Sequence, residues 1–175
     1  MEYLEKMLSN IGISDADMPR ALNNMGDFSN QVRMIESDND KTRVPYKKDG
    51  TLASSARGVY QFTRDSVSTG RQRMKNMGNM IGGLWEDGFI DSVQDDPQEW
   101  DDNTADSMFF SNLFSAPGTN SNLRDVALGS HTARQDLYTD IHHTDADEAT
   151  NNRMLKFIPN LMKKVDGLFS RNTRL

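Results

Sequence analysis

Apolar residues recur at helical spacing along most of this chain, and this periodicity limits the folds open to it. Phe28, Val32 and Ile35 stand at positions i, i+4 and i+7, so one face of a helix would carry all three. No succession of alternating strands is found, and the pattern predicts a mainly α fold. A chain of 175 residues is of single-domain length and can bury a core without covalent cross-links. It contains no cysteine, which excludes disulfides and thiolate metal sites.

Capping and breaking residues divide the N-terminal half into predicted helices. Glu2 to Leu8 are expected to form a short helix or an ordered arm, within an N-terminal arm at 1–14. A helix from about Ser14 to Met25 is expected to break at Gly26, and a second helix would then end at Glu36.

Residues 38–55 lack helical patterning and are predicted to form a surface loop or a small hairpin. Thr63 is expected to cap a helix that runs to about Met77 and is softened at Gly70. Asn103 or Thr104 would cap a helix that extends through Phe114. Further helices are predicted at 123–128, 131–143 and from Thr144 onward with a kink at Pro159, before a polar tail at 170–175.

Charge and hydropathy argue against two classes of binding partner. The chain has 20 Lys and Arg against 26 Asp and Glu, which argues against a nucleic-acid partner. No apolar run reaches membrane-spanning length, so no membrane partner is expected. The N-terminus is acidic and mixed, and no secretory signal is expected there.

Glu36 is the strongest candidate for chemistry. It follows the apolar stripe at the predicted C-terminus of a helix, where the helix dipole disfavours a negative charge and so favours the protonated acid. A carboxylic acid held opposite polar groups can protonate a glycosidic oxygen. Downstream, 56–62 reads Ala-Arg-Gly-Val-Tyr-Gln-Phe, a glycine-containing turn with an aromatic hydroxyl and an amide. Taken separately, the glutamate is equally compatible with a solvated residue, and the turn with a structural one that carries two core aromatics.

Together these segments resemble a motif pair of the soluble lytic transglycosylases and goose-type lysozymes. That family carries Glu-Ser at the end of a helix, matched here by Glu36 and Ser37, and then an Ala-x-Gly-x-x-Gln element. In a subset that includes the resuscitation-promoting factors, the second element is close to the sequence formed here by Gly58, Tyr60, Gln61 and Phe62. The likeness spans 32–62, less than a fifth of the chain.

The resemblance implies a lysozyme-like helical domain with a catalytic cleft, which cleaves the β-1,4 bond between N-acetylmuramic acid and N-acetylglucosamine in peptidoglycan. Glu36 would protonate the leaving oxygen and then, as carboxylate, take a proton from the 6-hydroxyl of the muramic acid, giving a 1,6-anhydro product. Asp38 and Asp40 lie close by in sequence, so a hydrolytic lysozyme with two carboxylates stays open. The residues expected to bind substrate around the acid are Ser37, Gly58, Tyr60 and Gln61.

A third group of candidates lies at Tyr138, His142 and His143. The family places a tyrosine from a later helix beside its acid, although the usual Ala-Tyr-Asn-Ala-Gly form is missing here. Tyr138 is therefore expected beside Glu36, with His142 bordering the same cleft; the alternative is that Tyr138 is only a core residue. The paired histidines lack the i, i+4 spacing and the third ligand of a zinc site, and no metal or cofactor is expected.

The expected function is cleavage of peptidoglycan glycan strands by a bacteriophage protein. A virion or a lysis system would deliver it to the periplasm or cell wall, and other virion proteins are possible partners. The alternative is a virion structural or adaptor protein that has a lysozyme-like fold and no activity. A third reading is a helical regulatory module.

Overall fold

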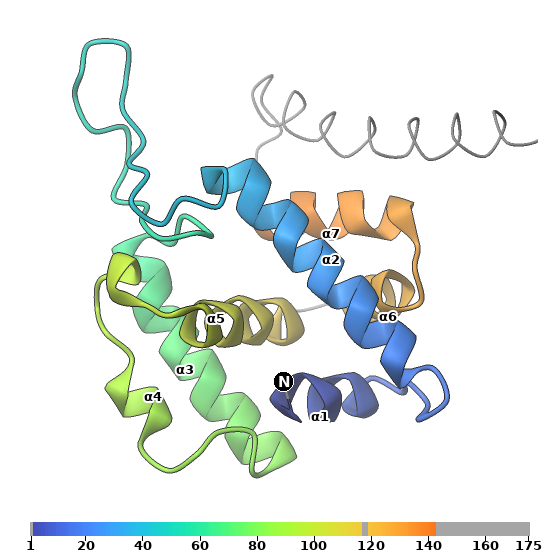
Figure 1. Cartoon of the computed structure of the whole chain (residues 1–175). Coiled ribbons are helices and arrows are strands. Elements are labelled where there is room, and N and C mark those ends of the chain that lie inside the picture. The colour runs from blue at the N-terminus through green and yellow to red at the C-terminus, as the bar shows by residue number, and fades with distance from the viewer. Residues whose placement is uncertain (1, 117–118, 143–175) are drawn as a thin grey trace, which may run out of the picture.

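The computed structural model describes residues 2–116 and 119–142, with only the backbone described for 139–142. The described part contains seven α-helices, one 3-10 helix and no strand, which confirms the mainly α prediction. Two isolated antiparallel bridges occur, at Tyr46–Leu52 and Arg57–Phe62. The helices, shown in Figure 1, are α1 (Glu2–Asn10), α2 (Met18–Ser37), α3 (Arg64–Ile81), α4 (Phe89–Ser92), η1 (Pro97–Glu99), α5 (Asp102–Ser115), α6 (Asn120–Ala127) and α7 (His131–His142).

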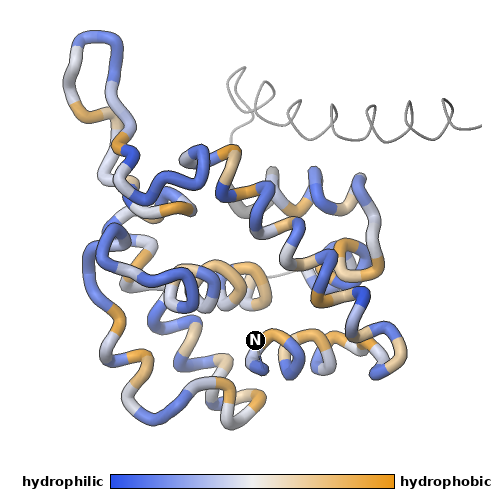
Figure 2. The backbone as a smooth tube through the Cα atoms, viewed as in Figure 1, coloured by the Kyte–Doolittle hydropathy of each residue, from blue (hydrophilic) through white to orange (hydrophobic). Residues whose placement is uncertain are grey.

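Helix α5 is the most deeply buried element of the described chain. All eight residues from 107 to 114 are buried, so the helix is covered on every side rather than along one stripe. Apolar residues run along it in Figure 2. Its aromatic rings pack on other segments: Phe109 lies 6.1 Å from Phe28 of α2 and stacks on Tyr60 at 4.3 Å, measured between ring centroids. Helix α5 therefore provides the surface on which α2 and the 56–62 turn meet.

Helix α2 is continuous, and the break expected at Gly26 is wrong. A glycine in a helix interior costs about 1 kcal/mol relative to alanine. The flanking side chains of Met25 and Phe28 are fully buried, and burying two side chains of this size stabilises the helix by about 1.5–3 kcal/mol each. Tertiary burial thus outweighs the local propensity.

The first residues of the chain form a helix rather than an arm. Leu4, Met7 and Leu8 of α1 have no exposed surface, and Lys6 donates a 2.7 Å hydrogen bond to the carbonyl of Gly83. Of the two expectations for Glu2 to Leu8, the structure bears out the helix, which extends to Asn10.

The limits of the later helices follow local signals, with two corrections. The Thr63 hydroxyl accepts from the Ser66 N–H at 3.3 Å, as expected for the cap of α3. Helix α3 is not softened at Gly70 but runs on to Ile81. The cap of α5 is Asp101 rather than Asn103 or Thr104, because its carboxylate accepts from the Thr104 N–H at 2.7 Å, which lowers the pKa of Asp101.

Helix α6 ends at Ala127, shortly before Gly129, and α7 spans His131–His142, both close to the expected limits. The helix expected from Thr144, its kink at Pro159 and the tail at 170–175 lie outside the described residues. None of the described helices is both long and apolar enough to span a membrane.

Gly26 and Gly70, both inside helices, are predicted to respond oppositely to alanine. A Cβ on Gly26 would meet nothing within 4 Å, whereas a Cβ on Gly70 would lie 2.1 Å from the Met108 Sδ of α5. Gly26→Ala should stabilise the protein by up to about 1 kcal/mol. Gly70→Ala should destabilise it by about 1–3 kcal/mol, since Met108 is fully buried and must move. Denaturant unfolding of both variants checks the prediction, and equal effects would contradict it.

Candidate active site

Glu36 lies in the last turn of α2 and is half-buried. The helix ends because Asp38 adopts a left-handed conformation with φ of 56°. The N–H groups of Asp38 and Asn39 then bond back to the carbonyls of Met34 and Arg33, both at 3.2 Å, which satisfies the free carbonyls at the helix end. The acid is therefore carried by a closed, regular helix terminus rather than by a loop.

The structure brings Tyr138 to Glu36, although the two residues are far apart in sequence. Tyr138 comes from α7, its side chain has no exposed surface, and its hydroxyl donates a hydrogen bond to Oε1 of Glu36. A phenol hydroxyl can donate to a carboxylate and accept from a carboxylic acid. It can therefore hold the side chain of Glu36 in either protonation state.

Ser37 faces inward and joins the two motif segments. It is fully buried, and its hydroxyl lies 3.1 Å from the Arg33 carbonyl and 2.9 Å from the Val59 carbonyl. The first contact is that of a serine near a helix C-terminus. The second ties the end of α2 to the 56–62 turn. The expected contact of Ser37 with substrate does not fit this placement.

Gly58 also serves the fold rather than an open surface. Its φ is +75°, and a Cβ there would lie 2.8 Å from the carbonyl oxygen of Pro97. Only glycine combines this backbone conformation with so close an approach. The segment that the Gly58 backbone approaches is η1, and the expected contact of Gly58 with substrate does not fit this placement.

Gln61 closes the turn and links it to the preceding loop. Its backbone is left-handed, with φ of 53°. Its side-chain amide donates to the carbonyls of Gly58 at 2.8 Å and of Arg43 at 3.2 Å. The turn is further closed by the Arg57 N–H, which donates to the Phe62 carbonyl at 2.9 Å. The amide nitrogen of Gln61 is thus engaged within the protein.

Tyr60 is a core residue, and its expected contact with substrate does not fit this placement. Its side chain is 1% exposed, and its ring stacks on Phe109 with an interplanar angle of 3°. Its hydroxyl meets Ser29 at 2.5 Å, accepts from Arg33 Nε at 3.0 Å and donates to Asp106. Burial raises the pKa of Tyr60, so the phenol remains a neutral donor.

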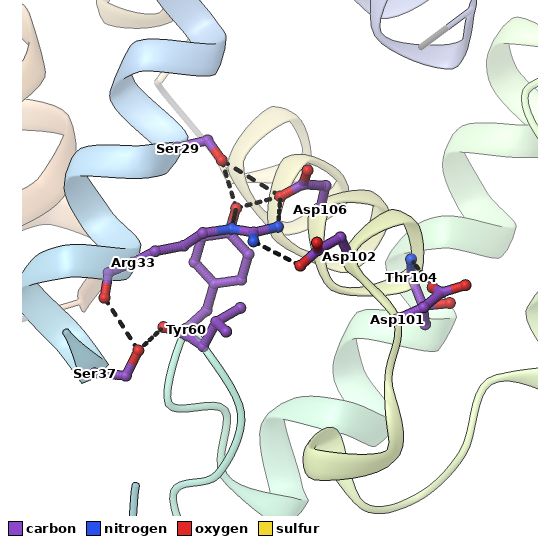
Figure 3. A network of polar contacts seen from close by, with 9 residues as sticks. Ser29, Arg33, Ser37, Tyr60, Asp101, Asp102, Thr104 and Asp106 are labelled. Carbon is purple, nitrogen blue, oxygen red and sulfur yellow. Dashed lines mark hydrogen bonds and ion pairs between the residues drawn. The ribbon is translucent and has the colours of Figure 1, made fainter. Parts of the chain in front are cut away.

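These contacts belong to a buried network that the sequence analysis missed (Figure 3). The Arg33 guanidinium donates to Asp102 and to Asp106 of α5, both at 2.7 Å. Burial opposes the charge of Arg33, but its hydrogen bonds to Tyr60 and the two aspartates outweigh that effect and raise its pKa. The sequence did contain a signal for this network. Arg33 lies within the apolar face of α2, and Asp102 and Asp106 are spaced i, i+4.

The loop at 38–55 carries the two other carboxylates considered for catalysis. It bends back on itself at the Tyr46–Leu52 bridge and projects from the helices in Figure 1. Asp38 forms an ion pair with Arg43. Asp40 accepts from the hydroxyl and N–H of Thr42 at 2.7 and 2.9 Å, which lowers its pKa. Both carboxylates are thus engaged by their own loop.

The histidine predictions cannot be placed on this site. His142 is the last residue of α7, and its side chain lies outside the described part, as does all of His143. Within 2–116 and 119–142, no group of three or more His, Asp or Glu side chains is arranged to hold a metal ion.

Comparison of the chain with protein-family models, curated proteins and solved structures finds no match. The likeness to lytic transglycosylases therefore rests on the residues of 32–62 and on the placement of Glu36 beside Tyr138.

We predict that Gly58→Ala lowers stability by more than Gly50→Ala does. Both glycines have a positive φ, +75° and +81°, so both variants should lose roughly 1–2 kcal/mol to left-handed strain. Only the Cβ at Gly58 would also meet Pro97, since nothing lies within 4 Å of one at Gly50. Melting temperatures of the two variants test this. An equal loss of stability in both variants would show that η1 moves to accommodate the added Cβ at little cost.

Proposed function

We propose that this protein cleaves peptidoglycan glycan strands, with Glu36 as the catalytic acid in a lysozyme-like helical fold. The observation that carries the proposal is the hydrogen bond from the Tyr138 hydroxyl to the Glu36 carboxyl, at a half-buried helix end. A tyrosine beside the acid is the third feature of the family that the Glu-Ser and Gly-x-Tyr-Gln-Phe segments resemble.

The chemistry needs one carboxyl group that acts twice. Protonated Glu36 gives its proton to the glycosidic oxygen as the bond to the muramic acid breaks, and the electron pair leaves with the departing sugar. The resulting carboxylate takes the proton of the muramic acid 6-hydroxyl while that oxygen bonds to the anomeric carbon. The product is a 1,6-anhydro sugar, and Glu36 is protonated again.

Tyr138 suits both halves of this cycle. Its hydroxyl donates to Oε1 of Glu36. Before proton transfer this oxygen is the carbonyl oxygen of the acid, so the acid proton on the other oxygen stays available for the glycosidic oxygen, and afterwards the same hydroxyl donates to the carboxylate. A cationic neighbour would stabilise only the charged form and so oppose the first step. The role of Tyr138 is to orient the Glu36 carboxyl without fixing its charge.

The alternative is a virion structural or adaptor protein without activity. It is favoured by the inward placement of Ser37, Gly58 and Tyr60, which explains these motif residues by packing alone. Delivery by a bacteriophage virion or lysis system fits either function. Mass spectrometry of purified peptidoglycan after incubation with the protein separates them: 1,6-anhydro or reducing-end products support the enzyme, and an unchanged wall supports the adaptor.

Glu36→Gln is predicted to lower wall cleavage by roughly 100-fold or more, because the amide has the shape of the acid but no proton to transfer. Cleavage is measured as release of soluble fragments, with circular dichroism to confirm folding. Asp38→Asn and Asp40→Asn are matched controls and should retain activity. A loss in either would favour the two-carboxylate hydrolytic mechanism, and full activity in Glu36→Gln would falsify its assignment.

Tyr138→Phe is predicted to lower kcat between about tenfold and 100-fold, with little change in KM. It removes one hydrogen bond to a charged group, worth about 1.5–3 kcal/mol. Tyr46→Phe is the matched control, because the Tyr46 side chain is 64% exposed on the loop and should not affect turnover. Unaltered kcat in Tyr138→Phe would reduce Tyr138 to a packing residue.

A further inference from the structure

Helices α6 and α7 contact α2 through a row of polar interactions that leads to Glu36. Asn24 Nδ2 donates to the Ala127 carbonyl at 2.9 Å. Arg134 then donates to the Asn24 carbonyl at 3.3 Å and to Gln31 Oε1 at 3.2 Å. Tyr138 donates to Glu36 at the end of the row. Residue numbers rise together on both sides of this row.

Arg134 is the residue of this row whose burial opposes folding most. It is 4% exposed, and both of its acceptors are neutral oxygens. Its Nε is buried with no hydrogen-bond partner among the described residues. Burial accordingly lowers the pKa of Arg134, against a smaller opposing effect of Asp27. An apolar side chain of similar length would avoid the cost of desolvating a guanidinium, which is several kcal/mol.

What the guanidinium adds over an apolar side chain is a fixed register. Its two acceptors are the backbone carbonyl of Asn24 and the side-chain oxygen of Gln31, from residues seven positions apart on α2. The planar group is rigid and bonds in fixed directions, so contacts to both acceptors hinder α7 from sliding or rotating. The apolar residues Ala133 and Leu137 also pack α7 in the core but are not directional.

We propose that Arg134 is a positioning residue, which sets the register of α7 so that the Tyr138 hydroxyl meets Glu36. Arg134 lies four residues before Tyr138, on the same face of α7. A displacement of about 1 Å can cost on the order of 100-fold in rate. The consequence of this role for catalysis rests on the proposed function, whereas its consequence for the Tyr138–Glu36 contact does not.

The first test reads the contact itself by NMR, with tyrosine isotopically labelled at Cζ. The chain has 4 tyrosines, and the Tyr138 signal is the one lost in Tyr138→Phe. Glu36→Ala gives the signal position for the broken contact. Arg134→Met should move the signal toward that position, and Arg134→Lys should move it less. Arg124→Met, at an exposed arginine of α6, is the matched control and should leave it in place.

An unmoved Tyr138 signal in folded Arg134→Met would overturn the proposal. If Arg134→Met does not fold, Gln31→Met removes one acceptor of the guanidinium from the α2 side and is judged by the same signal. In that variant a shift toward the broken position supports the proposal, and an unmoved signal overturns it.

The second test is a double-mutant cycle on wall cleavage. Arg134→Met should lower kcat by up to the factor lost in Tyr138→Phe, and the double variant should lose no more than Tyr138→Phe alone, because both changes act through one contact. Losses that multiply would show that Arg134 acts elsewhere and would overturn the proposal. If the wild type cleaves no wall material, the proposed function fails, and the NMR test still decides the role of Arg134.

Discussion

The buried guanidinium of Arg33 is the interaction on which the rest of the site depends. It contacts Asp106 of α5 and Tyr60 of the 56–62 turn, so three segments that are distant in sequence share one polar cluster (Figure 3). Removing one partner of a fully buried ion pair costs about 3–5 kcal/mol. The cost here is smaller, because the Asp106 side chain is 22% exposed and that of Asp102 is 84% exposed. Arg33 precedes Glu36 by three residues on α2. The contacts that close the core therefore also hold the helix turn that carries the acid.

Glu36 is placed from two sides by contacts of different origin. The turn holds the end of α2 through Ser37 and the Val59 carbonyl, while α7 supplies the Tyr138 hydroxyl directly. The first contact joins residues 22 positions apart and ends on a backbone carbonyl. The second joins segments far apart in the chain. Motif residues such as Ser37 and Tyr60 thus serve the fold whether or not chemistry takes place, and the Glu36–Tyr138 pair is the part of the motif that bears on the proposed catalysis.

Arg33 and Arg134 are both buried, but their charges are accommodated differently. Arg33 is matched by aspartates, and its hydrogen bonds keep it charged at all ordinary pH values. Among the described residues Arg134 has only neutral acceptors, and burial lowers its pKa. The ion pairs of Arg33 with the aspartates can be explained by the stability that they give to the packing of α2 on α5. An unmatched guanidinium is better explained by the directions of the hydrogen bonds that it makes.

Local signals in the sequence predicted four features correctly, because each depends on residues a few positions apart. These are the helical class, the Thr63 cap, the end of α6 near Gly129 and the bent loop at 38–55. They were misleading at Gly26 and Gly70, where a propensity of about 1 kcal/mol is overcome by burial against distant helices. The sequence also placed a carboxyl group at a helix end and a tyrosine on a later helix. The contact between Glu36 and Tyr138 depends on where α7 packs, and the inward direction of Tyr60 depends on where α5 packs. A turn or a helix can present the same side chain to the core or to solvent, and the element that covers it decides which.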